Sequence, residues 1–202
     1  IDPLWEKYYS LTPYQYAGNN PVSQYDVNGK WFVFVHIQNL LDALSEMKSI
    51  LNENKDKMAE GNAEVDKDQD NQYKHGMISD KDILDNGNDK NKAREKASEK
   101  AQDFIDKNLQ DFVQTGNYKS LGAATHTIQD LFAPSHLGFQ VYYTIGLSII
   151  KNVSHPLGDL VTGPVSKGLY DAAAIAVEKF VQKALTMRTE YLKLQSSAKE
   201  KK

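Results

Sequence analysis

The sequence of 202 residues contains no cysteine. Without thiols the chain can form no disulfide, no thiolate nucleophile and no cysteine-based zinc site, so any metal site must use histidine and carboxylate side chains. Long apolar runs are missing too: the richest, at 141–150, is interrupted by Tyr, Thr, Gly and Ser. No stretch reaches the roughly 18 apolar residues that a membrane-spanning helix needs. We therefore expect a chain that does not span a membrane.

A surplus of charge of one sign is also absent. The formal net charge is -3, and the lysines and arginines alternate with acidic residues through the middle of the chain. Proteins that bind nucleic acid without regard to its sequence generally carry a long basic patch. Strong nucleic-acid binding is therefore not expected. The hydrophobic fraction of 40% is ordinary for a globular protein with one core.

The first 30 residues differ in composition from the rest. They contain prolines at positions 3, 13 and 21, an Asn-Asn-Pro turn and five tyrosines. Because Pro, Gly and Asn favour turns, we expect an irregular, turn-rich segment at 1–30 and one main domain at 31–202. The chain begins at Ile1 inside this segment, and we expect it to be part of a longer protein.

Beyond residue 31 the apolar residues recur at helical spacing, and no long segment alternates as a strand would. The pattern predicts helices at about 36–51, 91–115, 120–132 and 165–195. Gly116 and Pro134 are expected to end the second and third of them. Residues 52–90 are polar and predict a long loop, unless a ligand such as a metal ion anchors it. The expected fold class is all-α.

The pattern that indicates chemistry is HTIQDLFAPSH. His126 and Asp130 are four residues apart on a predicted helix and therefore share one face. Because Pro134 breaks that helix, His136 can turn back toward the same point. His155 and Asp159 repeat the four-residue spacing.

The two remaining histidines can join this group, because His36 lies on the inward face of the first predicted helix and His75 lies in the polar segment. Each residue has an ordinary alternative: His36 as a hydrogen-bonded core residue, His126 with Asp130 as a surface pair, and Asp159 as a solvated carboxylate. Two His-x-x-x-Asp pairs and a further histidine together favour a metal site. Imidazole and carboxylate ligands suit zinc.

The segment from Gly116 to His136 resembles the zinc-dependent phospholipase C family, whose relatives include zinc-dependent single-strand nucleases. It shares the family's Gly-Asn-Tyr-Lys sequence before the histidine motif, its His-x-x-x-Asp on a helix and a histidine six residues after that Asp. The resemblance implies a helical, metal-centred domain with up to three zinc ions. The implied ligands are His36, a loop aspartate, His75, His126, Asp130, His136, His155, Asp159 and the backbone of Trp31.

Three residues are candidates for the loop aspartate: Asp66, Asp68 and Asp70. Asp66 is favoured, because Val65-Asp66 precedes a glutamine and a Tyr-x-His in the order that the family shows. The resemblance also gives Asp66 a catalytic role, in which it orients or deprotonates the attacking water.

Residues 1–29 resemble the segment that closes the core of Rhs-repeat proteins, with Tyr-Gln-Tyr, Gly-Asn-Asn-Pro and a final Asp-x-x-Gly in the family's order. The resemblance implies a toxin domain that is secreted or delivered into a target cell, with a cognate immunity protein. In the phospholipase family the mature chain begins at a metal-binding Trp. We therefore hypothesise that cleavage near Lys30 frees an amine at or next to Trp31 and activates the enzyme.

The expected function is phospholipase C-like hydrolysis of phospholipid at a membrane surface. Two alternatives remain open at this stage. The same ligand set could cleave single-stranded nucleic acid, or the histidines could hold a structural metal or none in a non-catalytic, membrane-acting module.

Overall fold

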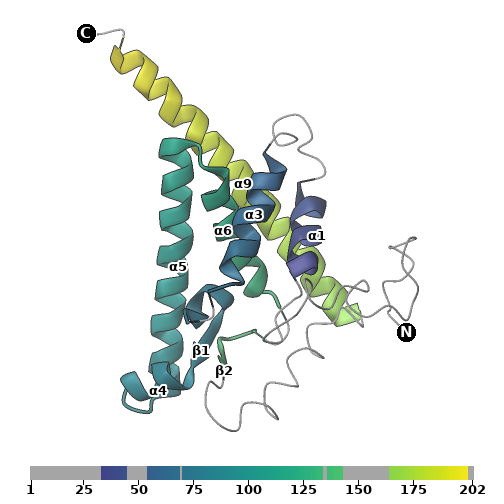
Figure 1. Cartoon of the computed structure of the whole chain (residues 1–202), viewed down its shortest axis with the longest axis vertical. Coiled ribbons are helices and arrows are strands. Elements are labelled where there is room, and N and C mark those ends of the chain that lie inside the picture. Colours follow the sequence, from purple (N-terminus) through teal and green to yellow (C-terminus); the bar gives the residue numbers. More distant parts are fainter. Residues whose placement is uncertain (1–32, 45–53, 69, 134–135, 143–163, 200–202) are drawn as a thin grey trace.

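The computed structural model of the protein describes residues 33–44, 54–68, 70–133, 136–142 and 164–199. The described residues form an all-α fold with one small pair of strands, as Figure 1 shows. In chain order the elements are α1 (Val33–Ala43), α3 (Lys55–Val65), the 3-10 helix η3 (Gln72–His75), β1 (Met77–Ser79), α4 (Asp80–Asp85), α5 (Lys90–Thr115), α6 (Tyr118–Asp130), β2 (Gln140–Tyr142) and α9 (Pro164–Lys199).

One apolar cluster joins the five long helices, and α6 packs against α3, α5 and α9. Phe112 of α5 and Leu121 of α6 are buried in it, and α1, α5, α6 and α9 contribute the apolar stripes that their sequence periodicity predicts. The buried members of the cluster are Leu40, Ala43, Leu44, Met58, Leu109, Phe112, Leu121, Val177, Val181 and Ala184.

Two glycines set the close approach of α3 and α6. A Cβ atom added at Gly61 would lie 2.0 Å from the carbonyl oxygen of Lys119, and one at Gly122 would lie 1.9 Å from that of Met58. Any side chain at either position would therefore collide with the backbone of the facing helix. This contact fixes the C-terminal end of α3, which is followed by Asp66, against α6, which carries His126 and Asp130.

The ends of α5 and α6 are fixed by side-chain caps. Asp89 accepts hydrogen bonds from the first turn of α5, and Asn117 accepts one from Lys119 in α6. Gly116 ends α5 with φ of 78°, in the left-handed region that glycine tolerates best. Arg188 of α9 then donates to the carbonyl oxygens of Val113 and Gln114, so α9 satisfies the last turn of α5.

The strands β1 and β2 pair in parallel, with Ile78 opposite Val141. Both of these side chains are buried with Ala93 and Ala97 of α5. The pairing holds the segment after His136 beside the segment after His75. It thereby brings together two parts of the chain that each carry a candidate ligand.

The prediction of helices at 91–115, 120–132 and 165–195 is confirmed within a few residues at each end. The helix expected at 36–51 is described only as α1, because residues 45–53 lie outside the described residues. In the described part of the chain, no helix is long and apolar enough to span a membrane.

The prediction of a long loop at 52–90 is wrong. Helix α3, η3, β1 and α4 occupy most of this segment. The periodicity is hidden because α3 buries only four residues, Met58, Gly61, Asn62 and Val65, of which one is a glycine and one is an amide. Its packing depends on close backbone approach rather than on a wide apolar stripe, and a hydrophobicity pattern does not detect that.

Candidate metal centre

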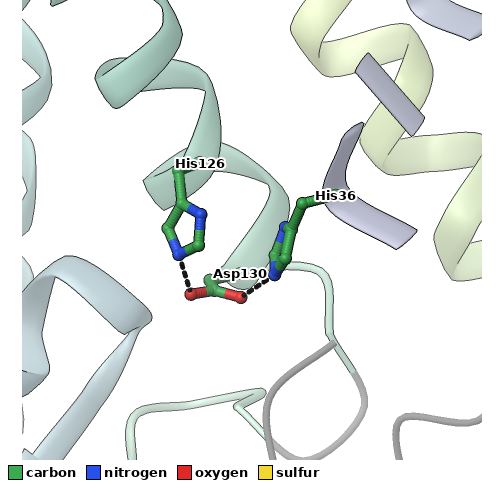
Figure 2. A group of neighbouring side chains, drawn as sticks. All are labelled: His36, His126 and Asp130. Atoms are coloured by element: carbon green, nitrogen blue, oxygen red, sulfur yellow. Dashed lines mark ion pairs between the residues drawn. The ribbon is translucent and has the colours of Figure 1, made fainter. Parts of the chain in front are cut away.

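Four of the five histidines gather around one carboxylate. His36 comes from α1, His75 ends η3, His126 and Asp130 lie one turn apart on α6, and His136 follows the turn after α6. Figure 2 shows Asp130 between His126 and His36, with one carboxylate oxygen directed at each ring. All five side chains are at most 1% exposed.

The two oxygens of Asp130 contact different histidines. Oδ2 lies 2.9 Å from Nε2 of His126 and 3.1 Å from Nδ1 of His75. Oδ1 lies 3.3 Å from Nε2 of His36 and 3.4 Å from Nδ1 of His136. A single carboxylate thus faces four ring nitrogens, two on each side.

The three candidate loop aspartates have different surroundings. Oδ1 of Asp66 lies 3.7 Å from Nε2 of His126, and the Asp66 side chain is 12% exposed. Asp68 instead accepts hydrogen bonds from Asn71 and Lys74, and Asp70 is exposed. Of the three, Asp66 is the one whose carboxylate the structure brings to the histidines.

A backbone carbonyl defines the protonation of His75. Nε2 of His75 lies 3.0 Å from the carbonyl oxygen of Asp68, which can only accept a hydrogen bond. Nε2 therefore donates to this carbonyl when it carries a proton, and Nδ1 is then the nitrogen that can bind a metal ion. That nitrogen faces Oδ2 of Asp130 and lies 3.2 Å from Nε2 of His126.

In the site, burial and the charges of neighbouring side chains shift the pKa values of Asp130 and His36 in opposite directions. Burial alone raises the pKa of Asp130, but His126, then His136 and His36, outweigh it, and the pKa of this carboxyl lies well below its usual range. Burial lowers the pKa of His36, but Asp130, Asp66 and a hydrogen bond with Gln129 hold it above its ordinary value. The site therefore favours an anionic Asp130 with positive charge facing it.

The donor set fits a metal ion. Ligand atoms of His36, His126 and Asp130 lie within 4.8 Å of one another, as do those of Asp66, His75 and His126. Two ligands on a tetrahedral zinc ion, with bonds of about 2.0–2.1 Å, are separated by about 3.3 Å. The separations of 2.9, 3.1 and 3.2 Å among Asp130, His126 and His75 are close to that value. These buried groups could hold a metal ion.

Three of the predicted ligands are not part of this description. His155, Asp159 and Trp31 lie outside the described residues. The group that the structure brings together is His36, Asp66, His75, His126, Asp130 and His136.

Sequence reasoning missed the buried amides behind the histidines. Gln129, Asn39 and Asn62 are each 0% exposed and hydrogen-bonded to one another or to His36. The available signal was the position of Gln129 inside HTIQD, next to Asp130 on the inner part of the helix.

Comparisons of the chain with protein-family models, curated proteins and solved structures found no match.

Proposed function

We propose that this chain is a metal-dependent phosphodiester hydrolase of the phospholipase C type, which uses up to three zinc ions and acts on phospholipid at a membrane surface. The observation that supports it best is the arrangement of four buried histidines around Asp130, with Asp66 beside His126. Buried histidines in contact with a carboxylate are the ligand types that zinc prefers.

In this proposal His36, His75, His126, His136, Asp66 and Asp130 would hold the metal, together with His155 and Asp159 from sequence. Bound zinc lowers the pKa of a water ligand and stabilises negative charge on phosphoryl oxygens. The protein residues supply the dry, rigid support for that chemistry, since five of the six described ligands are at most 1% exposed.

Asp66 is suited to a different role from the other ligands. Its side chain is 12% exposed, whereas that of His126 is fully buried. A partly exposed carboxylate can accept a proton from an attacking water or orient that water. We assign Asp66 to that step.

The biological setting belongs to the proposal as well. The resemblance of residues 1–29 to the end of an Rhs core supports a toxin domain delivered into a target cell and neutralised by a cognate immunity protein. The net charge of -3 and the absence of a long basic stretch support lipid over nucleic acid as the substrate.

The test compares three substrates on one zinc-loaded preparation: phosphatidylcholine vesicles, single-stranded DNA and single-stranded RNA. We expect release of a phosphorylated headgroup that is lost with a chelator and restored by zinc. The Asp130→Asn variant should be inactive, while Asp106→Asn, which changes an exposed carboxylate on α5, should retain activity.

Cleavage of the nucleic acids alone would replace the lipid substrate with the nuclease alternative. Zinc binding without turnover on any substrate would contradict an enzymatic role and favour a structural metal.

A further inference from the structure

Gln129 connects the metal ligands to the rest of the fold. It lies directly before Asp130 on α6, and its side chain is completely buried. Its Nε2 lies 2.9 Å from the main-chain oxygen of His36, and its Oε1 lies 3.3 Å from Nδ1 of the same histidine. One amide thus contacts both the backbone and the ring of one residue.

The orientation of this amide follows from two backbone carbonyls. Asn39 Nδ2 lies 2.9 Å from the carbonyl oxygen of Tyr170, which only accepts, so the other amide atom of Asn39 is its oxygen. That oxygen and the carbonyl oxygen of His36 both face the same atom of Gln129. This atom must be the donor nitrogen of Gln129, because two acceptors surround it.

The other end of the Gln129 amide is then the oxygen. It accepts a hydrogen bond of 2.7 Å from Asn62 Nδ2 on α3. The group that faces it from α1, Nδ1 of His36, must donate and therefore carries a proton. Nε2 of His36 faces a second acceptor, Oδ1 of Asp130, at 3.3 Å, so both ring nitrogens can carry protons in the metal-free site. A metal ion bound at Nε2 would take the place of one proton and leave the other on Nδ1, facing Gln129.

We infer that Gln129 is a positioning residue, which accepts a hydrogen bond from Nδ1 of His36 and so directs Nε2 of the same ring toward the metal ion. The inference rests on the proposed metal function and adds to it the group that prepares one ligand. The same hydrogen bonds join α1, α3 and α6, and through Asn39 they reach α9. One amide therefore links the contacts between four helices to the orientation of one ligand.

This preparation matters for metal binding because an imidazole nitrogen that carries a proton cannot bind a metal ion. Without an acceptor at Nδ1, binding of the metal ion through Nε2 is no longer favoured over binding through Nδ1. Partners that orient metal-binding histidines typically change metal affinity about 10–100-fold when they are removed.

The test uses nitrogen-15 NMR of the histidine rings in the zinc-loaded protein. The His36 signals are identified by their loss in His36→Ala. We expect wild-type His36 to be protonated at Nδ1. In Gln129→Met, which retains the side-chain length without the amide, we expect a tautomer mixture and zinc affinity lower by about 10-fold or more.

The matched control is Asn39→Leu, which removes a partner of Gln129 from the same buried network. Gln129 still donates to the His36 carbonyl in this variant, so its oxygen still faces the ring. We expect Asn39→Leu to lower the melting temperature while it leaves the His36 tautomer unchanged. A structural role alone would affect both variants in the same way.

Two results would overturn the inference. One is wild-type His36 protonated at Nε2, a measurement that needs no variant and decides the matter even if Gln129→Met does not fold. The other is a Gln129→Met protein with the wild-type tautomer and zinc affinity. Neither readout involves turnover, so a failure to hydrolyse phospholipid would contradict the proposed function and leave this inference standing.

Discussion

At the scale of single residues, the surroundings of each loop aspartate decide whether its carboxylate can act as a metal ligand. Asp66 directly follows α3, and its carboxylate lies near His126. Asp68 is only two residues further along the chain, but its side chain pairs with Lys74, and its backbone oxygen contacts His75. Asp68 therefore acts on the site through its main chain, which a side-chain substitution does not remove.

Replacing each loop aspartate with asparagine should give three different results. We expect Asp66→Asn to lower zinc content and abolish turnover, because it removes an anionic ligand. Asp68→Asn should retain metal with a small loss of stability, on the order of the 0–1 kcal/mol of an exposed ion pair. Asp70→Asn should resemble the wild type, since Asp70 is exposed. Elemental analysis and activity assays measure these outcomes, and loss of metal in Asp68→Asn with retention in Asp66→Asn would reverse the assignment.

The pKa of His36 predicts opposite effects of pH on the metal-free and the zinc-loaded protein. In the metal-free fold this pKa is raised above its ordinary value of 6.5 by the carboxylates of Asp130 and Asp66, which outweigh burial. The stability gained from a protonated His36 is therefore fully present below about pH 6.5 and is lost as pH rises through the raised pKa. Zinc binds only the deprotonated ring, so its stabilisation grows as pH rises over the same window.

Urea unfolding between pH 6 and pH 9 tests whether stability changes with pH in opposite directions without and with zinc. With a chelator present, the free energy of unfolding of the wild type, relative to His36→Gln, should fall as pH rises. With zinc present, the same difference should increase. A metal-free difference that rises with pH would show that His36 does not gain a proton on folding.

Much of the candidate site could be predicted from residue spacing. His126 and Asp130 share a helical face because they are four residues apart, and His136 follows the helix end, so the sequence places them near one point. The proton positions on His36 and His75 could not be predicted. They depend on Gln129 and on the Asp68 carbonyl, which are brought to the rings by tertiary contacts that leave no spacing pattern.

At the scale of helices, the crossing of α3 over α6 determines how Asp66 meets His126. The two helices touch at Gly61 and Gly122, where an added Cβ would lie 2.0 and 1.9 Å from a carbonyl oxygen of the facing helix. From the sequence alone, each of these glycines only lowers the helix propensity of its segment. Their role becomes visible only once the two backbones are packed together.

Gly122→Ala should therefore be strongly destabilising. The new methyl group would lie 1.9 Å from the carbonyl oxygen of Met58, so the helices must separate, at a cost of about 3 kcal/mol or more. Gly168→Ala in α9 is the matched control, because nothing lies within 4 Å of its Cβ position. That variant should gain about 0.5–1 kcal/mol from helix propensity. Urea unfolding compares the two, and a stable Gly122→Ala protein with full zinc affinity would contradict the packing described for α3 and α6.

Helices with a wide apolar stripe could be predicted from the sequence, whereas a helix with a narrow stripe could not. In α5, Ala93, Ala97, Ile105 and Phe112 recur on one buried face, and the predicted bounds agree with the structure. In α3 the buried face contains a glycine and an amide, so the same method predicted a loop. The pairing of β1 with β2 was also beyond sequence reasoning, because three-residue strands are too short to show alternation.

At the scale of the whole molecule, the order of the chain places the proposed cleavage junction directly before α1 in sequence. Helix α1 begins at Val33 and carries His36 into the candidate metal centre. The landmarks Gly29, Lys30 and Trp31 come immediately before it in sequence. A peptide nitrogen cannot act as an amine ligand, because its electron pair is delocalised into the amide. Cleavage at this junction would create that amine.

We predict that proteins starting at Trp31, Lys30 and Ile1 differ in metal content and activity. The form that starts at Trp31 should bind the most zinc and turn over fastest, and the form that starts at Ile1 should bind less. Purified preparations of the three, compared by elemental analysis and by release of headgroup from vesicles, measure this. Equal metal content and equal rates in all three would exclude activation by cleavage.

The proposed function depends on the binding of a metal ion by Asp130 and the histidines around it. Elemental analysis of the protein after equilibration with zinc and removal of free ions tests it most directly, with Asp130→Asn as the comparison and Asp106→Asn as the control. We predict between one and three zinc ions per chain in the wild type and in Asp106→Asn, following the number implied by the ligand set, and fewer in Asp130→Asn. A wild-type protein that is folded and retains no zinc would contradict the account.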